Sequence, residues 1–222
     1  CEYDAPREVI TLRENPRIVD ANGSTTGEEV EYEQKRRILS VHGRVRSVLK
    51  SKEGETSGPF ASSQRSPSPS VVTAETMQYW RDDSRARYSG NVQLLSESGQ
   101  LQAHTVDISE AGDRVEAEGD VRHLIPRRDP ALEKARNAEL ASKKDEKRAL
   151  RKAPILICSS GLRYARSENA IHYYGGIVLQ ADDIRMSAQS LDAEFDGEAN
   201  SVEWAIAKGG LQVRQDGREA SG

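Results

Sequence analysis

Aromatic residues are scarce in this chain, at 5% of its 222 residues. A polysaccharide-active β-repeat enzyme should show exposed carboxylates and aromatic rings clustered on one face, so that class is disfavoured. There is no His-Glu-x-x-His, no Gly-x-Ser-x-Gly elbow and no phosphate-binding glycine loop. His42, His104, His123 and His172 have no metal-ligand spacing. We therefore predict a protein that is not an enzyme, with no catalytic residues, metal or cofactor.

Cysteines are few, and long apolar runs and a basic excess are absent. Of the two cysteines, Cys158 follows Ile-Leu-Ile without a basic neighbour, which favours an inert core thiol over a nucleophile. No run approaches the ~18 apolar residues of a membrane-spanning helix. The net charge of -4 and the pI near 5.7 give no basic footprint, so nucleic acid is a poor candidate partner.

A repeat is the main positive signal, and it is clearest between Tyr88 and Val121. There, two blocks that alternate apolar and polar residues flank a Glu-Ser-Gly turn, which predicts two strands per unit. An aromatic residue or Ile precedes a glycine by eleven residues in four pairs: Tyr32 and Gly43, Tyr79 and Gly90, Ile108 and Gly119, Tyr164 and Gly175. Successive anchors are 29 residues apart from Tyr3 to Tyr32 and from Tyr79 to Ile108. Such a period predicts stacked units around a shared core, in a single domain over residues 1–222.

The repeat is less regular near the two ends of the sequence. Tyr3 stands eleven residues before Glu14, where the glycine is replaced, and Phe195 leads to Gly209 with a longer spacing. Cys1 occupies an apolar repeat position, which favours an excerpt of a longer chain over a lipidated mature terminus. The C-terminal Arg-Glu-Ala-Ser-Gly also looks cut.

Two segments interrupt the repeat. Residues 50–70 are rich in Ser, Pro, Gly and charge, a composition typical of a flexible surface loop. Residues 126–154 are rich in Ala, Leu, Glu and Lys, which predicts a charged insertion, helical or disordered. Both are expected to lie outside the stacked strands.

The alternation on the glycine strands can be phased. It places the repeat glycines on the same face as their apolar neighbours, with Arg46, Gln93, Arg122 and Gln212 on the opposite face. A glycine on the interior face either shapes the sandwich by allowing a bend or bulge, or makes room for a ligand. The glycines in question are Gly43, Gly90, Gly119, Gly175 and Gly209.

Four segments carry a resemblance to a known family: Asn-Pro-Arg-Ile-Val-Asp at 15–20, Tyr-Ser-Gly-Asn-Val-Gln-Leu at 88–94, Glu-Gly-Asp-Val at 118–121 and Tyr-Gly-Gly-Ile-Val-Leu at 174–179. The pattern resembles the OstA-like family, which includes LptA, LptC and the N-terminal domain of LptD. The resemblance covers nearly the whole chain apart from the two insertions. It implies an all-β fold: an open β-jellyroll of stacked antiparallel strands, built from about 29-residue repeats.

The resemblance also implies a function. It is a non-enzymatic bridge or scaffold for lipopolysaccharide transport across the periplasm to the outer membrane, with acyl chains shielded in an apolar β-trough. The implied partners are lipopolysaccharide or a related lipid, and other OstA-like modules that join through edge strands. The implied location is the periplasm, with any membrane anchor in a segment not present here. The interior positions expected to contact lipid are Val45, Leu49, Val92, Leu94, Val121, Ile177, Leu179, Leu211 and Val213.

A purely structural β-solenoid, in a filament or a surface stalk, is the alternative. Its interior would be filled completely by its own side chains, whereas a lipid conduit needs an apolar trough. The packing of the interior separates the two.

Overall fold

The structure is a computed structural model that describes residues 1–20, 23–50, 69–96, 99–109, 113–126, 154–195, 202–215 and 218–221. The predicted insertions at 50–70 and 126–154 lie almost entirely outside the described residues. The only helical element of the described chain is one 3-10 turn, η2 (Arg166–Glu168). No helix among the described residues is long and apolar enough to cross a membrane.

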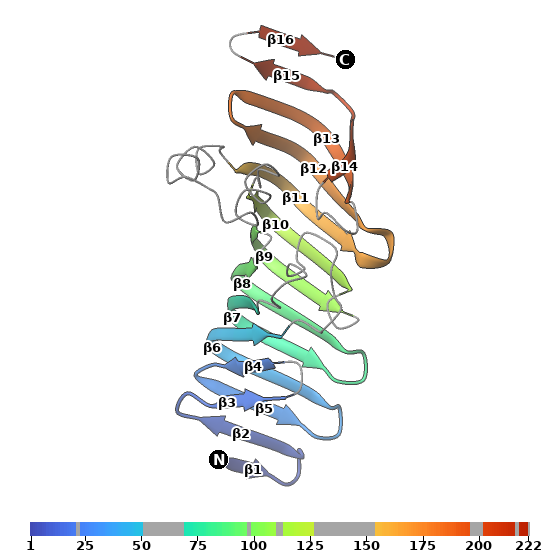
Figure 1. The fold of residues 1–222 in the computed structure, drawn as a ribbon. Helices are drawn as coiled ribbons and strands as arrows, with labels where there is room; N and C mark the ends of the chain where they lie inside the picture. Colours follow the sequence, from blue (N-terminus) through green and yellow to red (C-terminus); the bar gives the residue numbers. More distant parts are fainter. Residues whose placement is uncertain are drawn as a thin grey trace, which may run out of the picture.

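Sixteen antiparallel strands form one sheet. They are β1 (Glu2–Asp4), β2 (Val9–Arg13), β3 (Arg17–Val19), β4 (Gly23–Thr26), β5 (Glu29–Glu33), β6 (Ile38–Leu49), β7 (Ser70–Trp80), β8 (Arg85–Ser96), β9 (Gly99–Ser109), β10 (Arg114–Ile125), β11 (Ile155–Ala165), β12 (Ala170–Ala181), β13 (Ile184–Phe195), β14 (Val202–Lys208), β15 (Gln212–Gln215) and β16 (Arg218–Ser221). The strands from β5 to β13 pair in chain order and stack along one axis (Figure 1). The predicted all-β fold of stacked antiparallel strands is confirmed.

Every long strand has a break in its pairing near the middle. On β8, for example, the register shifts between Ser89 and Val92, where two residues oppose one residue of β9. At the ends of the stack the same break separates β2 from β3 and β14 from β15. We call the line of these breaks across the sheet the fold line.

Two consecutive residues with left-handed backbone mark the fold line on every second strand. On β8 they are Gly90 (φ 82) and Asn91 (φ 47). The remaining pairs are Glu14 and Asn15, Gly43 and Arg44, Gly119 and Asp120, Gly175 and Gly176, and Gly209 and Gly210. Glycine takes this conformation without steric cost, and Asn and Asp tolerate it better than other residues. Glu14 has φ 72, so it keeps the conformation although the glycine is absent.

The sheet is folded along this line into two layers. His123 on β10 and Tyr173 on β12 pair with Ile157 and Leu162 of β11, five positions apart. In a flat sheet that offset is ~16 Å along the strand and ~10 Å across it, beyond the reach of both side chains. Yet His123 Nδ1 and Tyr173 Oη lie 2.6 Å apart. The two halves of each strand must therefore face each other.

Layer 1 holds β1, β2, β5, β14 and the halves of the long strands that contain Val41, Met77, Tyr88, Val106, Val115, Leu162, Tyr173 and Leu191. Layer 2 holds β3, β4, β15, β16 and the halves that contain Val45, Val72, Val92, Leu101, Val121, Ile157 and Ile177. Buried side chains from both layers form one hydrophobic cluster that reaches from Val30 on β5 to Ala193 on β13. The core therefore lies between the layers and continues through the length of the stack.

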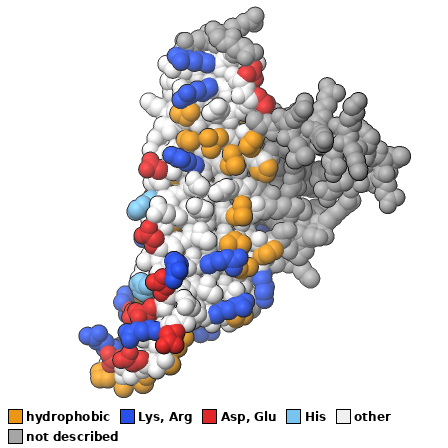
Figure 2. Space-filling model, turned by 90° about the vertical axis from the view of Figure 1, so that its left-hand side faces the viewer, with side chains coloured by type: hydrophobic (Ala, Val, Ile, Leu, Met, Phe, Trp, Pro, Cys, Tyr) orange, Lys and Arg blue, Asp and Glu red, His pale blue; other side chains and the backbone are white. Residues whose placement is uncertain are grey.

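The outer face carries polar side chains of both signs. Figure 2 shows Lys and Arg interspersed with Asp and Glu on one side of the stack, with hydrophobic side chains between them. Several charges pair across strands. Asp107 receives both Arg85 and Arg87, each at 2.8 Å, and Arg13 contacts Glu29 at 2.6 Å. Exposed pairs of this kind contribute little stability individually.

Candidate functional site: the interior between the layers

Seven of the nine predicted lipid-contact positions are brought together in the interior. Five of them are exposed by no more than 3%: Val45, Val92, Leu94, Val121 and Ile177. Leu49 and Leu179 are partly buried and pack against the same cluster. Leu211 and Val213 are half-buried and lie outside it. Period-2 alternation therefore predicted the inward face correctly on β6, β8, β10 and β12.

The repeat glycines do not lie on that face, and this part of the prediction is wrong. A Cβ built on Gly90 would meet the exposed side chain of Glu75, and one on Gly119 would meet exposed His104. The left-handed bulge turns the glycine outward although its sequence parity matches the inward residues. The glycines allow the strand to turn at the fold line, as the shape hypothesis expects, and they leave no space in the interior.

The interior is filled at its deep positions. A void large enough for water beside Val45, Val121 or Ile177 would expose those side chains, and their exposure is 0–1%. Two depressions lined by described residues lie on the outer face, around His104, Gly119 and Asp120. At these levels the layers pack like an ordinary protein core, as the filled-core alternative predicts.

Two buried tyrosines reach across the interior to polar partners. Tyr173, two residues before Gly175, shares a hydrogen bond with His123, four residues after Gly119. Tyr88 occupies the same place before Gly90, and its side chain hydrogen-bonds Ser47, four residues after Gly43. Both contacts join layer 1 to layer 2. Only the alternation of these tyrosines was visible in the sequence, because their partners come from strands about 40 to 50 residues earlier.

Burial sets the ionisation of these bridges. It lowers the pKa of His123 to about 4, so the imidazole is neutral near pH 7. Burial also raises the pKa of Tyr173 and of Tyr88, so both phenols keep their protons. For Tyr88 the hydrogen bond to Ser47 opposes that rise. Each bridge is therefore uncharged, which suits its apolar surroundings.

In the described part of the chain, the layers are joined by backbone along one side only. Within the described chain, the backbone hydrogen bonds connect neighbouring strands and turns, and none joins the ends of layer 1 to the ends of layer 2. We call the side away from the fold line the seam. Partly buried apolar side chains of both layers lie near it: Leu39, Leu49, Tyr79, Ala86, Ile125, Ile155 and Leu179. The seam can thus widen without breaking the sheet.

A further feature is the distribution of metal-ligating side chains and thiols around this interior. The described residues contain no group of three or more His, Cys, Asp or Glu that could hold a metal ion. Cys158 is half-buried with a free thiol, and Cys1 is exposed and also free. The arrangement offers an apolar core, two polar bridges and a seam.

Comparison with known proteins gives a likeness to solved structures. No protein-family model and no curated protein sequence matches the chain. Among solved structures the chain is similar to the crystal structure of LptH, the LptA-homologous periplasmic component of the lipopolysaccharide transport device of Pseudomonas aeruginosa. The match has a TM-score of 0.44 and 14% identity, and it covers 61% of this chain and 80% of that chain. Membership of the OstA-like family stays a prediction from the repeat.

Proposed function

We propose that the chain is a non-enzymatic lipid-binding bridge or scaffold for lipopolysaccharide transport, and that it works in the periplasm toward the outer membrane. The observation that carries the proposal is the interior itself: one apolar cluster spans successive hairpins between two layers that, among the described residues, are joined on one side only. An acyl chain in water exposes apolar area at a cost of roughly 25 cal/mol for each Å². A continuous apolar interior reached through a seam lowers that cost along the route.

Lipid entry in this mechanism begins at the seam. Leu49 and Leu179 are partly exposed and can meet an acyl chain first. Deeper residues such as Val92 become accessible only when the layers separate. Separation breaks the bridges at Tyr88 and Tyr173, each of which contributes roughly 0.5–1.5 kcal/mol. The bridges therefore regulate how readily the interior opens.

Further modules would join at the ends of the stack. Among the described strands, β1 and β16 each pair with one neighbour and present a second edge. An unpaired edge offers N–H and C=O groups to another strand. Another OstA-like module, or a second copy, is the partner that fits such an edge.

The second candidate is a structural β-solenoid with a permanently filled core, and the near-zero exposure of the deep residues favours it. Photo-crosslinking separates the two candidates. A photoreactive residue is placed at seam positions Leu49 and Leu179, at deep position Val92, and at Gln78, an exposed control in layer 1. The protein is then irradiated with lipopolysaccharide. A conduit labels the seam most strongly, Val92 less and Gln78 least. Equal labelling at all sites, or none, leaves the structural solenoid as the better account.

A further inference from the structure

A row of polar side chains crosses the outer face of layer 2. Strand pairing places Arg46 opposite Thr73, Thr73 opposite Gln93, Gln93 opposite Gln102, and Gln102 opposite Arg122. These are adjacent strands spaced by ~4.8 Å, so the row extends over ~19 Å between its two arginines. Arg46, Gln93 and Arg122 are exposed, and Thr73 and Gln102 are half-buried. The row is independent of the lipid-contact positions, which point the other way.

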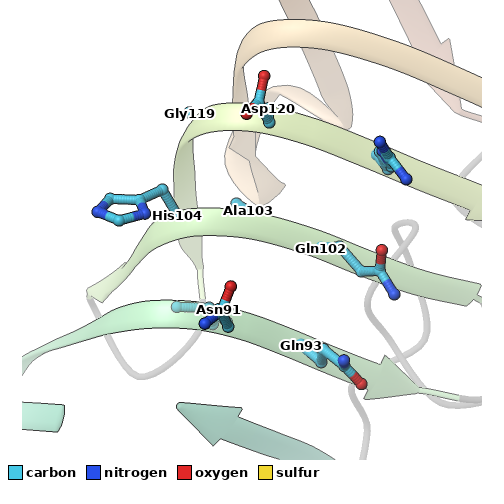
Figure 3. A pocket seen from close by; sticks show the side chains of 9 residues that line it. Asn91, Gln93, Gln102, Ala103, His104, Gly119 and Asp120 are labelled. Atoms are coloured by element: carbon cyan, nitrogen blue, oxygen red, sulfur yellow. The ribbon is translucent and has the colours of Figure 1, made fainter. Parts of the chain in front are cut away.

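The middle of the row is hollowed. A cavity of about 200 Å³ is lined by Gln93, Gln102 and Arg122 together with residues at the fold line. Figure 3 shows polar side chains that leave β8, β9 and β10 side by side, with His104 and Asp120 beside the fold line. Gly119 contributes no side chain there, which keeps that end of the hollow open.

Within the described chain, the side chains of the row have no ion-pair partner, although Asp120 lines the same hollow. Among the described residues, none forms an ion pair or a side-chain hydrogen bond with Arg46, Gln93, Gln102 or Arg122. Other outward arginines differ, because Arg85 and Arg87 share Asp107. The row thus presents two guanidinium groups and two amides with unused hydrogen-bonding capacity.

The hydrogen-bond donors and acceptors of the row indicate which class of ligand it would bind. Each glutamine amide both donates and accepts, which matches hydroxyl groups that do the same. Guanidinium groups prefer carboxylate or phosphate oxygens. The row has no aromatic side chain on which a nucleobase would stack. Exposed Leu95 and Leu124 flank it on β8 and β10, where they offer contact to the apolar face of a sugar ring.

We propose that the row from Arg46 to Arg122 is a binding site for an acidic saccharide, a hydroxyl-rich chain that carries phosphate or carboxylate groups. Amides in the hollow bind ring hydroxyls, and the two arginines bind anionic substituents. The saccharide is either free or the head of a glycolipid.

Titration by NMR tests the site. The probe is the lipid-free, phosphorylated oligosaccharide released from lipopolysaccharide by mild acid. We expect it to shift the side-chain amide signals of Gln93 and Gln102 in the full chain. The double variant Arg46→Ala/Arg122→Ala should weaken binding roughly fivefold or more. Gln78→Ala, a matched outward glutamine in layer 1, should leave binding unchanged.

Three other outcomes overturn the proposal in distinguishable ways, and a fourth identifies the source of the saccharide. Equal shifts with inorganic phosphate alone mean a simple anion site. Backbone amide shifts of undiminished affinity in Gln93→Ala/Gln102→Ala place the saccharide elsewhere. If whole lipopolysaccharide binds and the lipid-free oligosaccharide does not, the saccharide site is refuted while the lipid conduit stands. If the oligosaccharide binds and the seam does not crosslink to lipid, the free saccharide is the ligand.

Discussion

Acid should loosen the bridge between His123 and Tyr173. The pKa of His123 is lowered from 6.5 to about 4 by burial in the folded chain, whereas in the unfolded chain it keeps its ordinary value. As pH falls below 6.5 the unfolded state takes up the proton first. The stability of the folded state is therefore complete above pH 6.5 and is lost progressively down to about pH 4, below which both states are protonated.

The size of the loss follows from the shift. At about 1.4 kcal/mol per pKa unit, the limit is ~3 kcal/mol, and at pH 5 the loss is ~2 kcal/mol. Asp192 does not interfere in this window. Its pKa is lowered by hydrogen bonds from Lys208 and His172, so its contribution is lost only as pH falls below the ordinary carboxyl range.

Urea denaturation at pH 7, 6 and 5 measures this loss of folding stability in the wild type and in the double variant His123→Leu/Tyr173→Phe. The variant replaces both polar partners by apolar groups, so it removes the titration without leaving a buried hydroxyl unpaired. The wild type should lose ~2 kcal/mol more than the variant between pH 7 and pH 5. An equal loss in both proteins would refute the assignment of the pH dependence to this bridge.

Two further predictions concern the fold line and the stack ends. Gly90→Ala should lower the free energy of unfolding by roughly 1–2 kcal/mol, because alanine is strained in the left-handed backbone at this position and its Cβ meets Glu75. Glu14→Gly should raise the free energy of unfolding by roughly 0.5–1 kcal/mol, because glycine adopts the same left-handed conformation without strain. Gly176→Asn is the matched control in thermal melts: a Cβ there meets nothing within 4 Å, so a large loss would contradict the local explanation. Open edges at β1 and β16 predict association that grows with concentration, and a strictly monomeric sedimentation profile at high concentration would count against them.

The strands and their inward faces could be predicted because period-2 alternation is local. The inward orientation of Val92 and Leu94 follows from the residues next to them in the sequence. The outward orientation of the repeat glycines could not be predicted this way. The bulge turns each glycine outward, although its position in the alternating pattern matches that of the inward residues. A signal was nevertheless present: the residue after the repeat position is Asn15, Asn91, Asp120, Gly176 or Gly210 in five of six cases, all tolerant of left-handed backbone. The outer row from Arg46 to Arg122 depends on register between strands, which no single segment encodes.

Pairing in chain order has a consequence for how the protein folds. Most strands need only their predecessor, so hairpins can form one after another with little loop entropy to overcome. Two junctions differ. Between β6 and β7 the chain has 20 intervening residues, and between β10 and β11 it has 29. Loop-closure entropy is larger there than at a tight turn, although it grows only slowly with length. The stack should therefore assemble as three blocks, β1–β6, β7–β10 and β11–β16, each of which forms before it docks on the next.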